Sequence, residues 1–118
     1  NDDQVASRLQ ALSSDVADDV WRLPLWAGYE KGLDSKVADC KNVANGPYGG
    51  AIVAALYLQR YIQKVTSSDH DDKSDPPSWI HIDVMAYNQA STPGRPEGGE
   101  AMGMRALYAL LAERYAKP

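Results

Sequence analysis

Hydrophobic and polar residues alternate with a helical period at the start of the chain. Three apolar residues share one face of a predicted helix over residues 1–12: Val5, Leu9 and Leu12. Asn1, followed three residues later by Gln4, fits a capping box that starts such a helix. The next residues, 13–19, are mostly polar and are expected to connect this helix to the rest of the fold.

Three further helices follow from the same kind of pattern. Trp26, Tyr29 and Leu33 predict a short helix over residues 25–33. Residues 50–65 predict a longer helix whose first half is apolar all round, so it is expected to be buried on most sides. The last helix is predicted over residues 100–115, with four residues facing inward: Met104, Leu107, Leu110 and Leu111.

One segment reads clearly as a strand. Residues 79–85, WIHIDVM, carry apolar side chains on both faces, which is typical of a central strand in a sheet. Residues 35–40 are a weaker candidate, with Val37 expected to point inward. A strand needs neighbours for its backbone groups, so these two either pair with each other or have partners in sequence that is missing here. The whole chain, residues 1–118, suits one small domain or a piece of a larger one, and the pattern predicts helices with one or two strands.

Composition narrows the choice of partners and compartment. With 44% hydrophobic residues, the 118-residue chain can form a core, and its net charge of −4 leaves no basic stripe for nucleic acid or an anionic membrane. There is no apolar run of about 18 residues that would predict a membrane span. The acidic first residues do not resemble a signal peptide. The single cysteine, Cys40, fits a reducing compartment such as the cytoplasm.

The predicted strand at residues 79–85 carries the most suggestive chemistry. His81 and Asp83 share a face because residues i and i+2 of a strand point the same way. Such a pair can bind a metal ion or exchange protons. A metal site needs three or four donors, however, and His70, the other histidine, lies in a polar loop. The favoured interpretation is therefore a structural polar pair.

Three other motifs also favour a structural role. The acidic run DHDD at residues 69–72 is typical of a solvated loop rather than a cation site. The glycine-rich residues 46–50 precede a helix but lack the lysine of a phosphate-binding loop, which favours a turn. Cys40 has no clear histidine partner and is expected to be a small buried apolar residue.

Five segments in order resemble the leucyl (cytosol) aminopeptidase family of di-metal exopeptidases. They are VWRLPL (20–25), VADCKNVANG (37–46), GGAIVAALYLQRYI (49–62), WIHIDVM (79–85) and GGEAMGMRALYALL (98–111). The resemblance implies the C-terminal part of the catalytic domain, a portion of an α/β sandwich around a mixed sheet. It further implies a cytoplasmic protein that forms homo-oligomers, usually hexamers. The chain departs from the family where Met85-Ala86 replaces an Ala-Gly pair and Met102 replaces a threonine.

The resemblance also implies a reaction and its cofactors. The complete protein would remove N-terminal residues from peptide substrates with two divalent metal ions, zinc or manganese. The family's ligand motif, Asn-Thr-Asp-Ala-Glu-Gly-Arg, does not occur in these 118 residues. This chain is therefore expected to supply no metal ligand and no catalytic residue, and to be inactive alone. In the family, the strand that matches His81 and Asp83 contributes no ligand.

Met85 and Asn88 match family positions that line the pocket for the first side chain of the substrate. They are the candidate substrate-binding residues. Two alternatives remain open. The loop over residues 85–99 can instead pack as a subunit contact, and the whole chain can be a non-catalytic α/β interaction domain derived from such a hydrolase.

Overall fold

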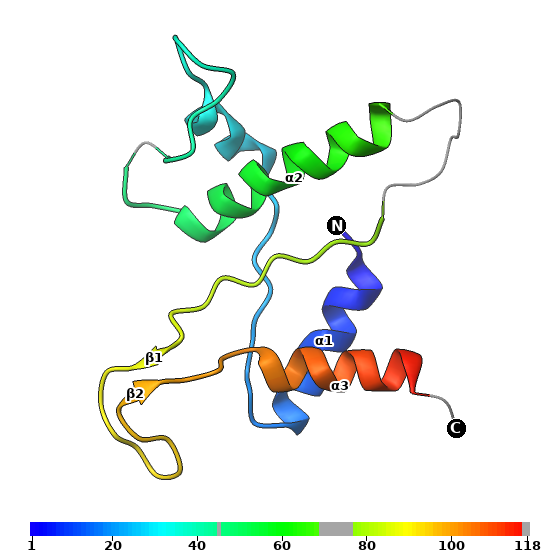
Figure 1. The fold of residues 1–118 in the computed structure, drawn as a ribbon, viewed down its shortest axis with the longest axis vertical. Coiled ribbons are helices and arrows are strands. Elements are labelled where there is room, and N and C mark those ends of the chain that lie inside the picture. The colour runs from blue at the N-terminus through cyan, green and yellow to red at the C-terminus, as the bar shows by residue number, and fades with distance from the viewer. Residues whose placement is uncertain (45, 69–76, 117–118) are drawn as a thin grey trace. The chain divides into compact units, whose positions relative to one another are not determined.

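The computed structural model describes residues 1–44, 46–68 and 77–116. It divides into two compact units: a helix-pair unit of Asp2–Arg22 and Ile80–Pro118, and a central unit of Asn1 and Leu23–Trp79. Figure 1 labels their helices and strands. Two earlier candidates, His70 and the acidic run at residues 69–72, lie outside the described residues.

Helix α1 of the helix-pair unit spans Asp3–Asp15. The Asp2 carboxylate caps it by accepting a hydrogen bond from the Val5 backbone N–H at 3.0 Å, so the predicted capping box from Asn1 is wrong. The helix also continues into residues that were predicted to be a connection. Ser13 is fully buried there. Its hydroxyl tolerates burial because it donates a hydrogen bond to the Gln10 carbonyl oxygen at 2.8 Å.

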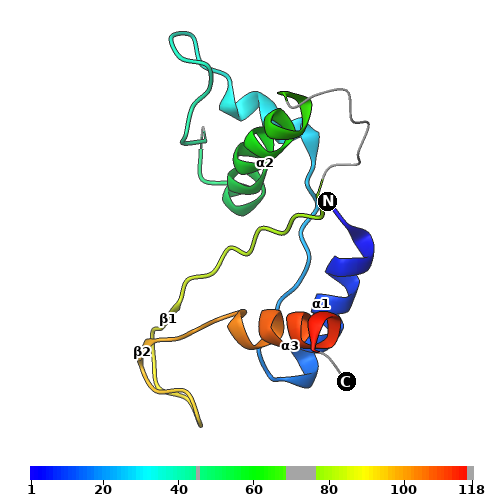
Figure 2. The same ribbon diagram turned by 45° about the vertical axis from the view of Figure 1, so that its right-hand side comes forward.

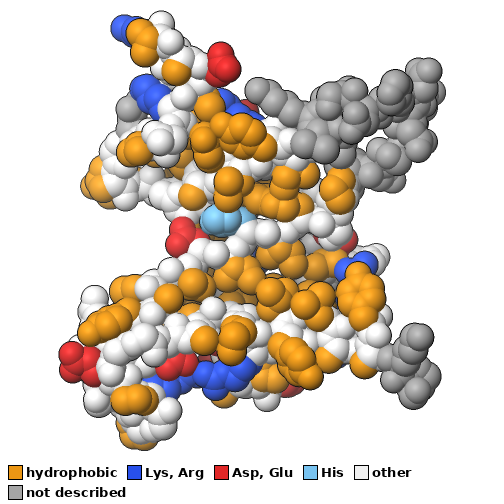
Figure 3. All heavy atoms as spheres, viewed as in Figure 1, with side chains coloured by type: hydrophobic (Ala, Val, Ile, Leu, Met, Phe, Trp, Pro, Cys, Tyr) orange, Lys and Arg blue, Asp and Glu red, His pale blue; other side chains and the backbone are white. Residues whose placement is uncertain are grey.

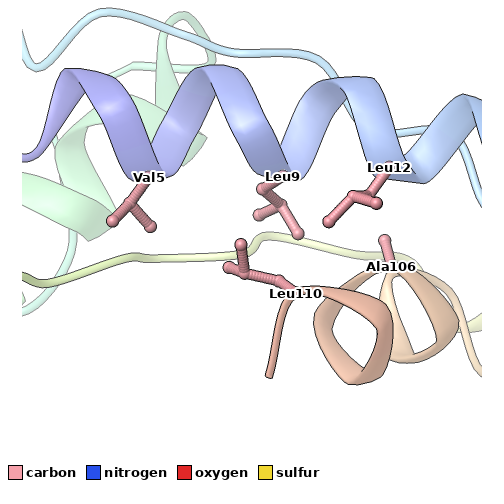
Figure 4. Packing of buried hydrophobic residues seen from close by; sticks show 5 residues of the cluster. All are labelled: Val5, Leu9, Leu12, Ala106 and Leu110. Atoms are coloured by element: carbon pink, nitrogen blue, oxygen red, sulfur yellow. The ribbon is translucent and has the colours of Figure 1, made fainter. Parts of the chain in front are cut away.

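Helix α3, Met104–Tyr115, packs against α1 in both views of the ribbon (Figures 1 and 2). The side chains between the two helices point toward one another (Figure 4). They form one buried cluster: Val5, Leu9, Leu12, Ala106 and Leu110. The helical pattern therefore predicted the buried face of α1 correctly.

The inward face of α3 differs from the prediction. Leu110 is buried as expected and Leu107 is half-buried, but Met104 and Leu111 are 60% and 47% exposed. Ala106, which was not predicted to be inward, is fully buried against α1. A small residue at this position lets the two helices approach closely, and the larger apolar residues then lie on other faces. The helix also begins later than predicted, after Gly103 in the left-handed conformation at φ 77°.

A short antiparallel sheet precedes α3. Strand β1, Tyr87–Asn88, pairs with β2, Gly98–Gly99, so that Tyr87 lies opposite Gly99 and Asn88 opposite Gly98. An isolated bridge between Thr92 and Arg95 closes the tip of the connecting loop.

The strand predicted at residues 79–85 is wrong for this structure. Within the described part of the chain, no backbone ladder includes these residues. Ile80 and Ile82 are half-buried against the helix pair, whereas Asp83, Val84 and Met85 are exposed. The apolar pattern is that of a strand, but a strand also requires a neighbouring strand to pair with.

The central unit is built on two helical elements. The short helix predicted at residues 25–33 is confirmed as a 3-10 helix, η1, Ala27–Leu33. It packs on helix α2, Gly50–Ser68, through a core of Leu33, Val53 and Leu56. Helix α2 extends past residue 65, where the prediction ended it.

Of two further predictions for this unit, one is confirmed and one is wrong. The apolar first half of α2 is buried on most sides, as predicted: over residues 51–58 only Ala54 and Leu58, which share one face, are exposed. Residues 35–40 form bends rather than a strand, and Val37 is 98% exposed instead of pointing inward. Val37 therefore has no partner surface among the residues that the structure describes.

Candidate functional site

Met85 and Asn88 lie where the chain enters the small sheet of the helix-pair unit. Met85 is 61% exposed, and its sulfur accepts a long hydrogen bond from the Gln89 side-chain amide at 3.9 Å. Ala86 follows with φ 54°, a left-handed conformation that is unfavourable for residues other than glycine. The turn is held by the Glu100 backbone N–H, which donates to the Ala86 carbonyl oxygen at 3.1 Å. Met85 therefore presents a flexible apolar side chain on the surface.

Asn88 is half-buried in β1, and its side-chain amide is fixed by two partners. Its Nδ2 group donates to the Pro96 carbonyl oxygen at 3.1 Å and to Glu100 Oε2 at 3.1 Å. Each partner comes from the returning side of the loop. The two candidate pocket residues thus differ: Met85 is held loosely, whereas Asn88 has a set orientation.

Glu100 is the centre of a polar cluster behind Asn88. Its side chain is only 11% exposed and pairs with two guanidinium groups. Arg95 Nη1 lies 3.3 Å from Glu100 Oε1, and Arg105 Nη2 lies 2.9 Å from the same oxygen. Arg95 also donates to the Ala17 carbonyl oxygen. The carboxylate therefore ties β1, the loop and the first turn of α3 together.

Asp18 holds the start of α3 from the far end of the sequence. Its buried carboxylate accepts hydrogen bonds from the backbone N–H groups of Gly103, Arg105 and Ala106, at 2.9, 2.8 and 3.2 Å. Burial alone would raise the pKa of Asp18, but these three hydrogen bonds, with the nearby Arg105, lower it below the ordinary value. Gly103 has no side chain to cap the helix, and Asp18 performs this role.

Asp18, Arg95 and Glu100 were all missed by the sequence analysis. Asp18 falls in the residues assigned to a polar connection, and nothing near it in the sequence indicates a helix start 85 residues away. Glu100 was noted only as the first residue of a predicted helix. The one available signal was Gly103, since a helix that begins after glycine needs a cap from elsewhere.

The residues that suggested metal chemistry do not form a site here. His81 is half-buried and Asp83 is exposed. Over residues 1–44, 46–68 and 77–116, no three side chains among His, Cys, Asp and Glu group closely enough to hold a metal ion. The described residues therefore do not fit a two-metal centre by themselves.

Cys40 has a polar environment that was not expected. It is half-buried, and its Sγ lies 3.9 Å from the Tyr61 hydroxyl, which donates to the Tyr57 hydroxyl at 3.0 Å. The hydrogen bonds to Tyr57 and Cys40 raise the pKa of Tyr61. Cys40 was predicted to be a small buried apolar residue, and this is wrong because it is half-buried beside a hydroxyl group.

The glycine-rich segment before α2 is a turn, as expected. Gly46 and Gly49 both have positive φ, at 89° and 68°. A side chain at Gly49 would also meet the ring of Tyr29 at 3.1 Å. Glycine is needed there for backbone conformation and for close packing.

Comparison with known proteins identifies relatives along the whole chain. The model of the cytosol aminopeptidase family, catalytic domain, matches residues 1–108. The chain is 34% identical to a probable cytosol aminopeptidase of Methylorubrum populi and 36% identical to one of Rhodopseudomonas palustris, over 99% and 98% of its length. The crystal structure of the cytosol aminopeptidase from Coxiella burnetii is 39% identical over 97% of this chain, with a TM-score of 0.80.

The shared fold is that of an α/β peptidase domain, which confirms the predicted fold class. The chain belongs to the cytosol aminopeptidase family. It spans about a fifth of the length of these relatives, 21% of the two curated proteins and 22% of the crystallised chain. None of the described helices is long and apolar enough to cross a membrane.

Proposed function

We propose that residues 1–118 are the C-terminal part of the catalytic domain of a metal-dependent aminopeptidase that removes N-terminal residues from peptides. The observation that carries this proposal is the match to family members over nearly the whole chain, together with the small share of each relative that it covers. A cytoplasmic location and assembly into a homo-oligomer, a hexamer in the complete enzyme, belong to the same proposal.

The role of this chain is that of a scaffold and a pocket wall. Large apolar side chains are exposed on the helix-pair unit, and Figure 3 shows hydrophobic side chains on the visible surface. They include Met85, Tyr87, Met104, Tyr108, Leu111 and Tyr115. Apolar surface of this extent suits burial against other parts of a larger domain. Met85 and Asn88 would line the pocket for the first side chain of the substrate.

The two metal ions, zinc or manganese, would be held outside this chain. The described residues provide no ligand set of three or more donors. Their contribution to hydrolysis is therefore to bind and orient the substrate side chain. Hydrolysis itself would depend on residues that the complete protein adds.

The test compares the isolated chain with the complete protein that contains it. Calorimetric titration with zinc and with manganese is run beside an assay that releases aniline from leucyl-anilide. The complete protein is expected to bind metal and to hydrolyse leucyl-anilide, and the isolated chain is expected to do neither. If the complete protein lacks both properties, the alternative of a non-catalytic interaction domain holds. Turnover by the isolated chain would overturn the scaffold role and return attention to His81 and Asp83.

A further inference from the structure

The amide of Asn88 can adopt only one orientation in this structure. An asparagine amide has two N–H donors on nitrogen and an acceptor on oxygen. The two groups that face Nδ2, the Pro96 carbonyl oxygen and Glu100 Oε2, both accept hydrogen bonds. A flipped amide would place Oδ1 against these two oxygens, with no hydrogen between them. The hydrogen-bond pattern therefore assigns nitrogen to the inside of the loop.

The orientation of the Asn88 amide is reinforced by the two charged partners of Glu100. The Glu100 carboxylate is paired with Arg95 and Arg105, and the Glu100 side chain is largely buried behind Asn88. Held between two guanidinium groups, the carboxylate acts as an acceptor toward Asn88. Glu100 is thus a positioning residue, because it acts on any bound molecule only through the Asn88 amide.

Oδ1 of Asn88 is left open by this arrangement. Both amide hydrogens are in use, and none of the residues that the structure describes donates to Oδ1. This oxygen is also not among the described buried polar atoms that lack a hydrogen-bond partner. Oδ1 is therefore an acceptor that is not fully buried, on the same short segment as the exposed Met85.

We infer that Asn88 makes the pocket selective for first residues with an uncharged hydrogen-bond donor on a flexible stem, of which glutamine is the type. This inference rests on the proposed function of the chain. Met85 would contact the stem, and Asn88 Oδ1 would accept from the donor. A cationic donor is disfavoured, because one carboxylate and two guanidinium groups leave a net positive charge behind Asn88.

Glutamine and methionine substrates isolate this contact. The two side chains are close in length and shape, but only glutamine carries an N–H donor. In the complete protein, kcat/KM is measured for glutaminyl- and methionyl-anilide, and the ratio of the two is the readout. Asn88→Leu removes the acceptor at similar size and is expected to lower the ratio about three- to tenfold, the value of one hydrogen bond. The matched control Asn42→Leu, at an exposed position of the central unit, is expected to leave the ratio unchanged.

A second variant tests the positioning role of Glu100. In Glu100→Gln, the new amide can donate as well as accept, so it no longer forces the Asn88 nitrogen inward. The ratio is expected to fall by a smaller factor than in Asn88→Leu, and this variant also serves if Asn88→Leu does not fold. If the ratio of glutaminyl to methionyl kcat/KM stays constant in every variant that folds, the inference is overturned. The proposed function stands in that case as long as the methionyl substrate is hydrolysed. Absence of hydrolysis by the unaltered complete protein would overturn both.

Discussion

Asp18 Oδ1 accepts a hydrogen bond from the Gly103 backbone N–H at 2.9 Å, across 85 residues of sequence. The same carboxylate also accepts from the first turn of α3. A negative charge at a helix N-terminus is stabilising because the free N–H groups and the helix dipole both favour it. Arg105 donates its backbone N–H to Asp18 and a guanidinium N–H to Glu100, so the contact from Asp18 also supports the polar cluster that orients Asn88.

Replacing Asp18 is expected to destabilise the helix-pair unit. Asp18→Ala leaves three backbone N–H groups at the start of α3 without their acceptor, and we expect a loss of about 2–3 kcal/mol in the free energy of unfolding. Urea unfolding of the 118-residue chain measures this loss. Asp19→Ala is the matched control, because Asp19 is exposed and, among the described residues, its side chain accepts a hydrogen bond only from the Ser14 hydroxyl. Equal effects of the two substitutions would contradict the capping role.

The contribution of Asp18 should depend on pH. Its pKa in the folded state lies below the ordinary value, about 3.9 for an aspartate. A lowered pKa means that the folded state prefers the ionised form, so the stabilisation is fully present above that ordinary value and is lost as pH falls through the folded pKa. The difference in unfolding free energy between the unaltered chain and Asp18→Asn should be constant near pH 7 and shrink below about pH 4. A difference that does not change with pH would contradict this.

The contact between α1 and α3 is expected to be the main source of stability in its unit. Leu9 is 5% exposed within the cluster that joins the two helices. Leu9→Ala removes buried contacts and leaves a cavity, so the expected loss is about 2–5 kcal/mol. Gln10→Ala, on the exposed face of the same helix, should change stability by less than about 0.5 kcal/mol. Thermal unfolding followed by circular dichroism distinguishes the two, and similar melting temperatures would argue against this packing.

Gly103 is expected to tolerate no side chain. Its φ of 77° is unfavourable for alanine, and a Cβ there would lie 3.3 Å from Ile82 Cγ2. Gly103→Ala should therefore cost at least about 1 kcal/mol. Gly99→Ala is the control, since Gly99 has no positive φ and open space around its Cβ position. If both variants unfold at the same urea concentration, the strained turn before α3 is not present.

The sequence predicted local features well and long-range partners poorly. The buried face of α1 was predicted from Val5, Leu9 and Leu12, because the helix itself sets the spacing of residues on one face. Ala106 was not recognised as a core residue, because its burial depends on how closely α1 approaches, and Leu111 looked more suitable by hydrophobicity alone. The strand expected at residues 79–85 shows the same limit: its pattern is local, but its pairing is not.

The candidate site also combines residues that the sequence predicted with partners that it did not predict. Met85 and Asn88 were named through the family resemblance, and their role as pocket residues stays a prediction. The partners that fix Asn88, Pro96 and Glu100, come from the far side of a loop and have no signature in the sequence. Asp18 is the most distant case, since neither its burial nor its helix cap follows from its neighbours.

The central claim, that this chain forms the wall of the first-residue pocket, is tested most directly by Met85→Ala in the complete protein. Relative kcat/KM values are measured on leucyl, methionyl and alanyl substrates, with Met104→Ala as the matched control because Met104 is equally exposed on α3. A larger pocket should shift the preference among these substrates by about 1 kcal/mol or more, roughly fivefold, in Met85→Ala only. Relative rates that stay within about twofold of the unaltered enzyme, well below that scale, would contradict the claim.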